Sequence, residues 1–442
     1  MFRHRPLPGR RVPRPRDPQT AASGGERWGA GGRGGGRWLS WPMRFGAAAA
    51  AFLGLVSGAL VLAPAPALAG LRSGPCVLPR TGVHHSEGLD TWNAAYPRPA
   101  GRLDAVLVYL SFPGAKPRET PRELSRDYFP ATTDFYTRAS YGRMRLVPHV
   151  RPGWVRMPRP ASAYAIERDW GDGGRSAYLR DALAAADPGT DFSRYDVVYL
   201  VADPDAPGVN PDATKVVNLG TPLHADGTAL RRFVTVFEQH PPDHNVLAHE
   251  TGHVFDLPDL YHRPADGKGD WDTHVGDWDL MGSQFALAPE FFGWHKWKLG
   301  WLDDARVACL PAGGDNRVDL APLAAPLPKG LRGAPRLAVV RTGPYRALAI
   351  EVRTARGNDV TTCSEGVLLY EVRTDTASAQ GPVKVYDTHP GTGGCASRSV
   401  QPGLADAPLG VGETYTVPGS GLRITVEAKT PDAEWTVRVR SS

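Results

Sequence analysis

The segment HETGHVFDLPD, residues 249–259, decides how this chain of 442 residues is interpreted. His249 and His253 are four residues apart, so both imidazoles lie on one face of a helix and can reach a single tetrahedral zinc ion. Glu250 follows the first histidine and is placed to act on a zinc-bound water rather than on the metal itself. The alternative is an ordinary amphipathic helix whose histidines are solvated or serve as caps.

Residues on either side of this segment predict where the helix begins and ends. Asp243 or Asn245 can serve as the N-cap, because the prolines just before them interrupt any preceding element. Pro258 prevents the helix from continuing, so we expect it to end near Phe255 or Asp256.

Two further residues of the segment bear on a metal site. Asp259 follows the turn, where a third ligand can fold back onto the metal; its alternative role is to cap its own backbone in the turn. Gly252 costs about 1 kcal/mol in a helix interior. Its presence indicates the close approach of another backbone or a ligand, unless it is simply tolerated.

Residues 1–69 are predicted to be a leader with a secretory signal peptide. An apolar run from Phe45 to Ala63 is followed by the small-x-small cleavage signature Ala67-Leu68-Ala69. The run has ordinary signal-peptide proportions if the native start is Met43. The protein is therefore expected to be secreted, without a stable membrane anchor after cleavage. An uncleaved signal anchor is the alternative, since the run is nearly long enough to span a bilayer.

Removal of the leader changes the charge of the chain. The whole chain carries a formal charge of +5, and residues 1–69 contain 10 Arg and no Lys against Asp17 and Glu26. The remainder is therefore slightly acidic, with a net charge of −3. This balance gives no reason to expect nucleic-acid binding.

The four cysteines form an even set, which favours two disulfides in an exported chain. Three connectivities are possible. We favour Cys363–Cys395, which closes a local loop, and Cys76–Cys309, which ties the N-terminal segment to the end of the catalytic domain. The alternative for Cys76 is a thiolate that blocks the zinc in a latent precursor, which would leave Cys309 without a partner.

Predicted strands and helices alternate ahead of the metal helix, which favours an α/β (α+β) catalytic domain over residues 101–304. Residues 70–100 resemble an arm or a short pro-segment. From about residue 305, short strands separated by turn residues predict an all-β, sandwich-like C-terminal domain over residues 305–442. The strands are expected at 103–112 and 195–201 and, in the β domain, at 337–341, 347–353, 366–372 and 422–426; the helices are expected at 130–139 and 176–186.

Three features lie between the metal helix and the β domain. The acidic loop from Arg263 to Asp279 could hold a calcium ion, although a solvated loop also explains it. Met281 lies in a tight turn and can form an apolar floor beneath the zinc ligands, or be plain core. Pro289 to Leu302 is predicted to be an aromatic packing helix.

Together these segments resemble the immune inhibitor A family of secreted bacterial zinc metalloproteases. The likeness covers roughly residues 100–430. It rests on HETGHVFDLPDLY at 249–261, VGDWDLMG at 275–282, KLGW at 298–301, SYG at 140–142 and EGVL at 365–368.

The resemblance implies a metzincin-like domain that binds Zn²⁺ and cleaves proteins or peptides. It implies that Glu250 is the general base and Met281 the turn methionine. The zinc ligands that it implies are His249, His253 and Asp259. A catalytically silent zinc-containing binding or adhesion module is the rival function, and Glu250 argues against it because a structural zinc site has no use for that carboxylate.

One departure from the family pattern affects the third ligand. Asp256 stands where the family usually has glycine, which leaves His262 as a substitute for Asp259. A zinc peptidase of another clan would use an acidic ligand such as Glu290. The group that stabilises the oxyanion is left open, with Tyr261, His262 and His274 as candidates.

Overall fold

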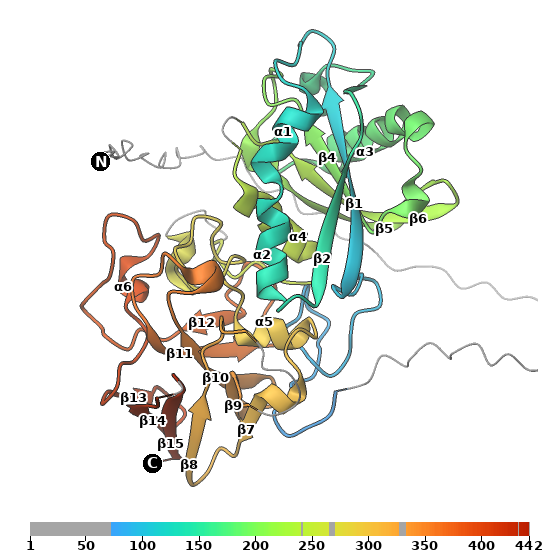
Figure 1. Ribbon diagram of the computed structural model, residues 1–442. Coiled ribbons are helices and arrows are strands. Elements are labelled where there is room, and N and C mark those ends of the chain that lie inside the picture. The colour runs from blue at the N-terminus through green and yellow to red at the C-terminus, as the bar shows by residue number, and fades with distance from the viewer. Residues whose placement is uncertain (1–71, 240–241, 265–269, 327–332, 432, 442) are drawn as a thin grey trace, which may run out of the picture. The chain divides into compact units, whose positions relative to one another are not determined.

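The computed structural model describes residues 72–239, 242–264, 270–326, 333–431 and 433–441, which all belong to one compact unit, Ala65–Ser442 (Figure 1). The predicted leader, with its signal peptide and the start at Met43, lies outside the described residues. The described part is a mixed α/β fold with a β-rich C-terminal region, which agrees with the prediction of an α/β region followed by a β-rich one.

The first half of the chain forms a six-stranded sheet of order β2-β1-β4-β6-β5, in which β3 also pairs with β1. The pairs are parallel except that of β5 with β6, so β5 is an antiparallel edge strand. The strands are β1 (Gly101–Ser111), β2 (Met144–Val150), β3 (Val155–Arg156), β4 (Val197–Ala202), β5 (Lys215–Ala225) and β6 (Thr228–Val236).

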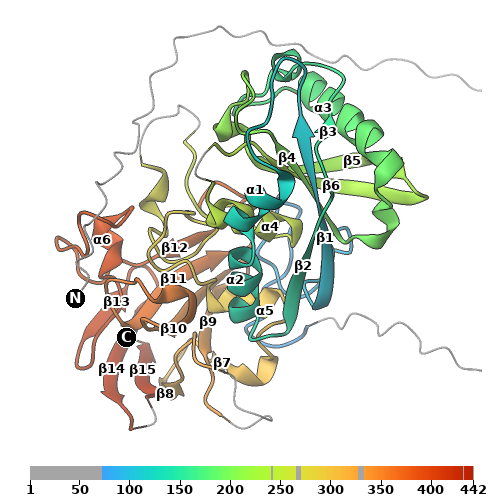
Figure 2. The ribbon, with the colours of Figure 1, turned by 45° about the horizontal axis from the view of Figure 1, so that its top comes forward.

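Helices cover both faces of this sheet (Figures 1 and 2). Alternate residues of β1 enter different cores: Leu107 and Tyr109 pack with α1, α2 and α4, whereas Val106 and Val108 pack with α3. The predicted elements of this half are confirmed to within a few residues. The helices are α1 (Pro121–Tyr128), α2 (Ala131–Ala139), α3 (Asp172–Ala186) and α4 (His244–Val254).

The C-terminal half contains two further sheets, of order β12-β11-β10-β9-β7 and β13-β14-β15-β8. They enclose a shared apolar cluster, to which Ile350 and Ile424 belong, as a sandwich requires. The strands are β7 (Val307–Leu310), β8 (Asp315–Leu320), β9 (Leu337–Gly343), β10 (Arg346–Arg353), β11 (Gly366–Arg373), β12 (Val383–Val385), β13 (Thr414–Val417), β14 (Leu422–Lys429) and β15 (Trp435–Ser441); the short helix α6 is Pro402–Ala405.

The outer face of the five-stranded sheet packs into the same core as the metal helix. Ala347 and Ala349 of β10 share one apolar cluster with Leu247 and Ala248 of α4. Residues on both sides of position 305 therefore contribute to a single core around the site.

The prediction of one long aromatic helix over residues 289–302 was wrong in extent, because only α5 (Gly293–Lys298) is helical. At its start, the N–H groups of the N-cap and the first helical residue donate to buried carboxylates from other segments: Phe292 to Asp279 (2.7 Å) and Gly293 to Glu351 (2.7 Å). After it, Gly300 adopts a positive φ of 79°. The aromatic side chains are buried, as a packing role requires.

Two disulfides, Cys76–Cys309 and Cys363–Cys395, confirm the favoured connectivity. The first ties the arm, defined here as residues 72–100, to β7 across 233 residues of sequence. Both bonds are compatible with an oxidising compartment. None of the described helices has the length and apolar character that crossing a bilayer requires.

Replacing Cys76 and Cys309 together by serine is expected to lower the free energy of unfolding by about 2–5 kcal/mol, because the unfolded chain regains the entropy of a long loop. The matched control replaces Cys363 and Cys395, whose separation is 32 residues. The chain-entropy relation predicts a loss about 2 kcal/mol smaller for the control. Guanidinium unfolding of both variants measures the difference, and equal losses would contradict the loop-length argument.

Candidate metal centre

Helix α4 is buried on all sides, unlike an amphipathic surface helix. Asp243 is its N-cap and accepts a hydrogen bond from the N–H of Asn245 (2.9 Å), which settles the choice between the two predicted caps. Every residue from Val246 to Val254 is buried. Histidines in such a helix cannot be solvated surface groups, so each needs a partner inside the protein.

His249, His253 and Asp259 form the single group of potential metal ligands found among the described residues, with ligand atoms within 4.8 Å of one another. Asp259 Oδ1 lies 3.2 Å from Nε2 of His249 and 3.0 Å from Nε2 of His253. Burial would raise the pKa of Asp259, but the two histidines outweigh it and hold that pKa well below its usual range. The carboxylate is therefore ionised.

The outer contacts of the group orient its two imidazole rings. His249 Nδ1 bonds to the carbonyl oxygen of Leu280, and His253 Nδ1 bonds to that of Leu257, both at 2.8 Å. Each carbonyl accepts a proton carried by Nδ1, so both Nε2 atoms face into the group. Burial would lower the pKa of His253, but Asp259 outweighs it and raises that pKa to about 9. A metal ion would take the place of that proton, and two imidazoles with one carboxylate are a donor set that fits zinc.

Asp259 is fixed by a residue from the β-rich region. The hydroxyl of Ser378 donates to Asp259 Oδ2 (3.1 Å) and accepts the backbone N–H of Asp259 (2.9 Å). Nothing in the sequence near Ser378 signals this role.

Glu250 lies beside the group without belonging to it. Its side chain is buried, and Oε2 accepts a hydrogen bond from the backbone N–H of Val216 on edge strand β5 (2.8 Å). Burial raises the pKa of Glu250, although the charges of His249 and His253 partly oppose that effect.

Met281 packs directly against the metal helix, which explains Gly252. A Cβ atom built on Gly252 would lie 2.5 Å from Met281 Sδ, closer than atoms can approach. The turn that carries Met281 is held by Asp279, whose Oδ1 accepts the N–H of Met281 (2.8 Å). The close approach predicted from Gly252 is present, but the approaching group is the Met281 side chain rather than a backbone or a ligand.

Gly252→Ala is expected to weaken zinc retention and to lower the free energy of unfolding by about 1–3 kcal/mol, because Met281 must move. Gly173→Ala in α3 is the matched control: no atom lies within 4 Å of its Cβ position, and the change should be neutral or stabilising. Zinc content and thermal unfolding measure both variants. Adding Met281→Ala to the Gly252→Ala variant should restore part of the lost stability and zinc retention. If it restores neither, the contact with Met281 is not the cause of the loss.

Asp256, the residue that departs from the family pattern, anchors the arm. It adopts a positive φ of 65°, and its carboxylate pairs with Arg80 and bonds to His85 Nδ1 (2.8 Å). The His85 ring stacks on that of His253, with centroids 5.7 Å apart. Lys298 of α5 donates to the carbonyl oxygen of Asp256 (2.8 Å). The arm thus buttresses the turn between the second histidine and Asp259.

A second buried network connects the arm to the Met281 turn. His295 of α5 bonds through Nε2 to Glu87 (2.7 Å) and through Nδ1 to Asp279 (2.9 Å). Burial would lower the pKa of His295, but Glu87 and Asp279 outweigh it and raise that pKa to about 9. A charged imidazole therefore bridges two buried carboxylates, and Glu87 belongs to the arm.

The other candidate ligands lie outside the group. Glu290 pairs with Lys296 (3.2 Å), and the ring of His262 tilts against that of His274 at 5.0 Å. Tyr261 is closer, because its ring is parallel to that of His249 at 6.5 Å. Burial and the neighbouring Asp259 raise the pKa of the Tyr261 hydroxyl, which therefore lies beside an expected ligand.

Two carboxylates of the acidic loop accept hydrogen bonds from backbone N–H groups that follow the loop. Asp277 accepts the N–H of Leu287 (3.0 Å), and Asp279 holds the Met281 turn as described above. Asp266 lies outside the described residues. The described carboxylates of this loop do not form a further group of potential metal ligands.

No family model matches this chain, and no curated protein matches it. Two crystal forms of wild-type OgpA from Akkermansia muciniphila are among the similar solved structures. The first has 11% sequence identity and a TM-score of 0.28, the second 10% and 0.25; each match covers 67% of this chain and 95% of the other. A likeness of this size supports no statement about fold or function.

Proposed function

We propose that this protein is a secreted zinc-dependent endopeptidase of metzincin-like architecture, similar to the immune inhibitor A family. The observation that carries the proposal is the position of Glu250, a buried carboxylate beside a His/His/Asp group whose ligand atoms already converge. A structural metal site needs the three ligands but has no use for this fourth group.

His249, His253 and Asp259 would hold the zinc. When bound, zinc lowers the pKa of a water and polarises the carbonyl of a peptide bond. The bonds to Leu280 and Leu257 keep both imidazoles in one tautomer, and Ser378 keeps Asp259 turned toward them. These outer contacts fix the ligand geometry before any substrate arrives.

Glu250 would move the proton. Its Oε2 is held by the N–H of Val216, which leaves Oε1 to accept a proton from the attacking water. The same oxygen would then deliver that proton to the leaving amine. Because the backbone fixes the carboxylate, little orientational freedom is lost during the reaction.

Edge strand β5 would align the substrate. The N–H of Val216 points away from β6 and toward Glu250. The edge of β5 that is not paired with β6 therefore runs beside the Glu250 carboxylate. An extended peptide can add to such an edge through backbone hydrogen bonds. This arrangement favours protein or peptide substrates that bind as a strand.

Removal of zinc is expected to abolish activity and its return to restore it. The experiment measures casein hydrolysis by the purified protein before dialysis against a chelator, after it, and after one equivalent of zinc is added back. Zinc content is measured at each stage. Hydrolysis that persists in the zinc-free protein would refute the proposal.

Zinc bound without hydrolysis would instead favour the binding module or a latent precursor. Cleavage of the chain within the arm separates these outcomes, because only a latent precursor gains activity from it. The contacts of the arm with Asp256 and with His295, which in turn bonds to Asp279, favour an arm that stays in place.

A further inference from the structure

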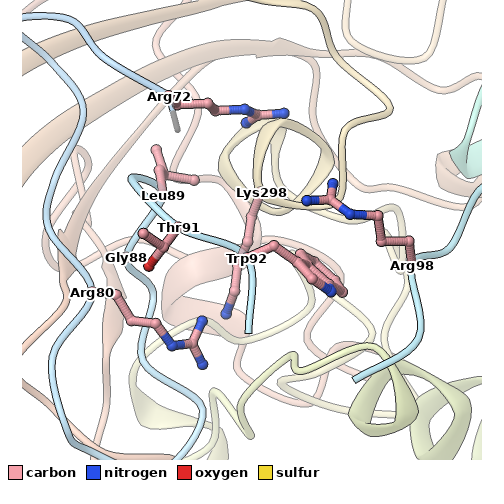
Figure 3. A pocket seen from close by; sticks show the side chains of 8 residues that line it. All are labelled: Arg72, Arg80, Gly88, Leu89, Thr91, Trp92, Arg98 and Lys298. Carbon is pink, nitrogen blue, oxygen red and sulfur yellow. The ribbon is translucent and has the colours of Figure 1, made fainter. Parts of the chain in front are cut away.

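The arm and α5 enclose a basic recess beside the metal-site turn, called the arm pocket here and defined by Arg72, Arg80, Trp92, Arg98 and Lys298 (Figure 3). Its volume is about 30 Å³, it is open to solvent, and its lining contains four basic side chains and no acidic one. Like charges gather in this way at sites that receive an anion.

The four cations differ in how far their charge is already compensated. Arg80 pairs with the carboxylate of Asp256, and Lys298 lies 3.4 Å from Glu87. Arg72 donates to the carbonyl oxygen of Trp297 and has a long contact of 3.9 Å to Asp304, whose side chain is two-thirds exposed.

Arg98 has no ion-pair partner among the described residues, and its guanidinium stacks over Trp92 at 5.2 Å from the ring centroid. Figure 3 shows the guanidinium groups of Arg72 and Arg98 extending toward one another. Burial lowers the pKa of Arg72, and the charge of Arg98 adds to this effect. Asp304 opposes this shift more strongly than Arg98 adds to it, and Arg98 is exposed, so the repulsion between the two cations is modest. An anion between them would interact favourably with both.

We propose that the arm pocket binds a small tetrahedral oxyanion, a sulfate or a phosphate group. Guanidinium groups present parallel N–H donors that match such oxygens. The recess is small, which favours one oxyanion group over an extended polyanion. The group can come as a free ion or as the exposed end of a larger molecule, since the pocket opens to solvent.

Occupancy would strengthen the attachment of the arm to the site. Arg80 and Lys298 line the pocket and bond to Asp256, which lies three residues after His253. An anion that bridges these cations to Arg98 would resist separation of the arm from the metal-site turn. The binding itself does not depend on zinc or on the proposed peptidase activity.

The test is calorimetric titration of the full-length secreted protein with inorganic phosphate and with sulfate, at constant ionic strength in chloride buffer. Arg98→Gln is the informative variant, because it removes a charge without leaving a buried carboxylate unpaired. It is expected to weaken binding about ten- to hundredfold. Arg122→Gln, an exposed arginine on α1, is the matched control and should bind as the wild type does.

Saturable binding in the wild type and in Arg122→Gln, with the expected loss in Arg98→Gln, supports the site. Absence of saturable binding, an unchanged affinity in Arg98→Gln, or equal binding of acetate overturns it. Circular dichroism confirms that each variant is folded. Titration with glucose 6-sulfate distinguishes a free ion from an oxyanion group on a larger molecule. Tighter binding than inorganic sulfate indicates a group on a larger molecule, and weaker binding indicates a free ion. Either result supports the oxyanion site.

Discussion

Glu250→Gln is expected to lower kcat/KM for casein by about a thousandfold while one zinc remains bound per chain. General-base catalysis contributes about 10²–10⁴ to such reactions, and an amide cannot accept the proton. The replacement keeps the size of the side chain, and its amide oxygen can still accept the N–H of Val216. The loss would therefore report on proton transfer rather than on folding.

Glu290→Gln is the matched control for this change. It makes the same substitution in another buried carboxylate, one that pairs with Lys296 and lies outside the His/His/Asp group. We expect it to keep both zinc and hydrolysis. Loss of zinc from this variant would favour a peptidase of another clan with Glu290 as ligand, and near-normal turnover in Glu250→Gln would refute the proposed mechanism.

Arg353→Met is expected to lower the free energy of unfolding by about 3–5 kcal/mol, the largest effect on stability that we predict. Arg353 is completely buried in β10 and pairs with Asp359 (2.8 Å) and Glu351 (3.2 Å). It also donates to the carbonyl oxygens of Trp278, Ala288 and Glu290. Methionine fills much of the same volume but leaves two buried carboxylates without their cation.

The position of Arg353 predicts a second consequence. Its backbone partners flank the turn that carries Met281, so the variant should also retain zinc less firmly. Arg438→Met is the control, because Arg438 pairs with Asp315 near the surface, where solvent screens the interaction. Guanidinium unfolding and zinc content measure both variants. Equal stability of the two would show that the buried network contributes little.

The elements of this fold follow from local signals in the sequence. Continuous apolar runs specify β1 and β4, which are buried on both faces, and Pro258 with the N-cap Asp243 limits helix α4. The aromatic segment was misjudged because its backbone donors are taken by Asp279 and Glu351, which are distant in sequence. Local propensity could not anticipate those acceptors.

Part of the candidate site was also visible in the sequence. The spacing of His249 and His253 placed both rings on one helix face, and Gly252 signalled the close approach that proved to be Met281. The roles of Ser378, His85 and the arm could not be found in this way, since each depends on a contact across more than a hundred residues.

The sequence by itself determined the chemistry available to this protein: two histidines and a carboxylate at ligand spacing, a glutamate beside them, and cysteines suited to two disulfides. Only the tertiary structure decided how these groups are held. It placed Asp256 under the arm, Asp259 against Ser378, and four basic side chains around one recess. The physical reason is that backbone periodicity is a short-range property, whereas buried charges find partners wherever packing brings opposite groups together.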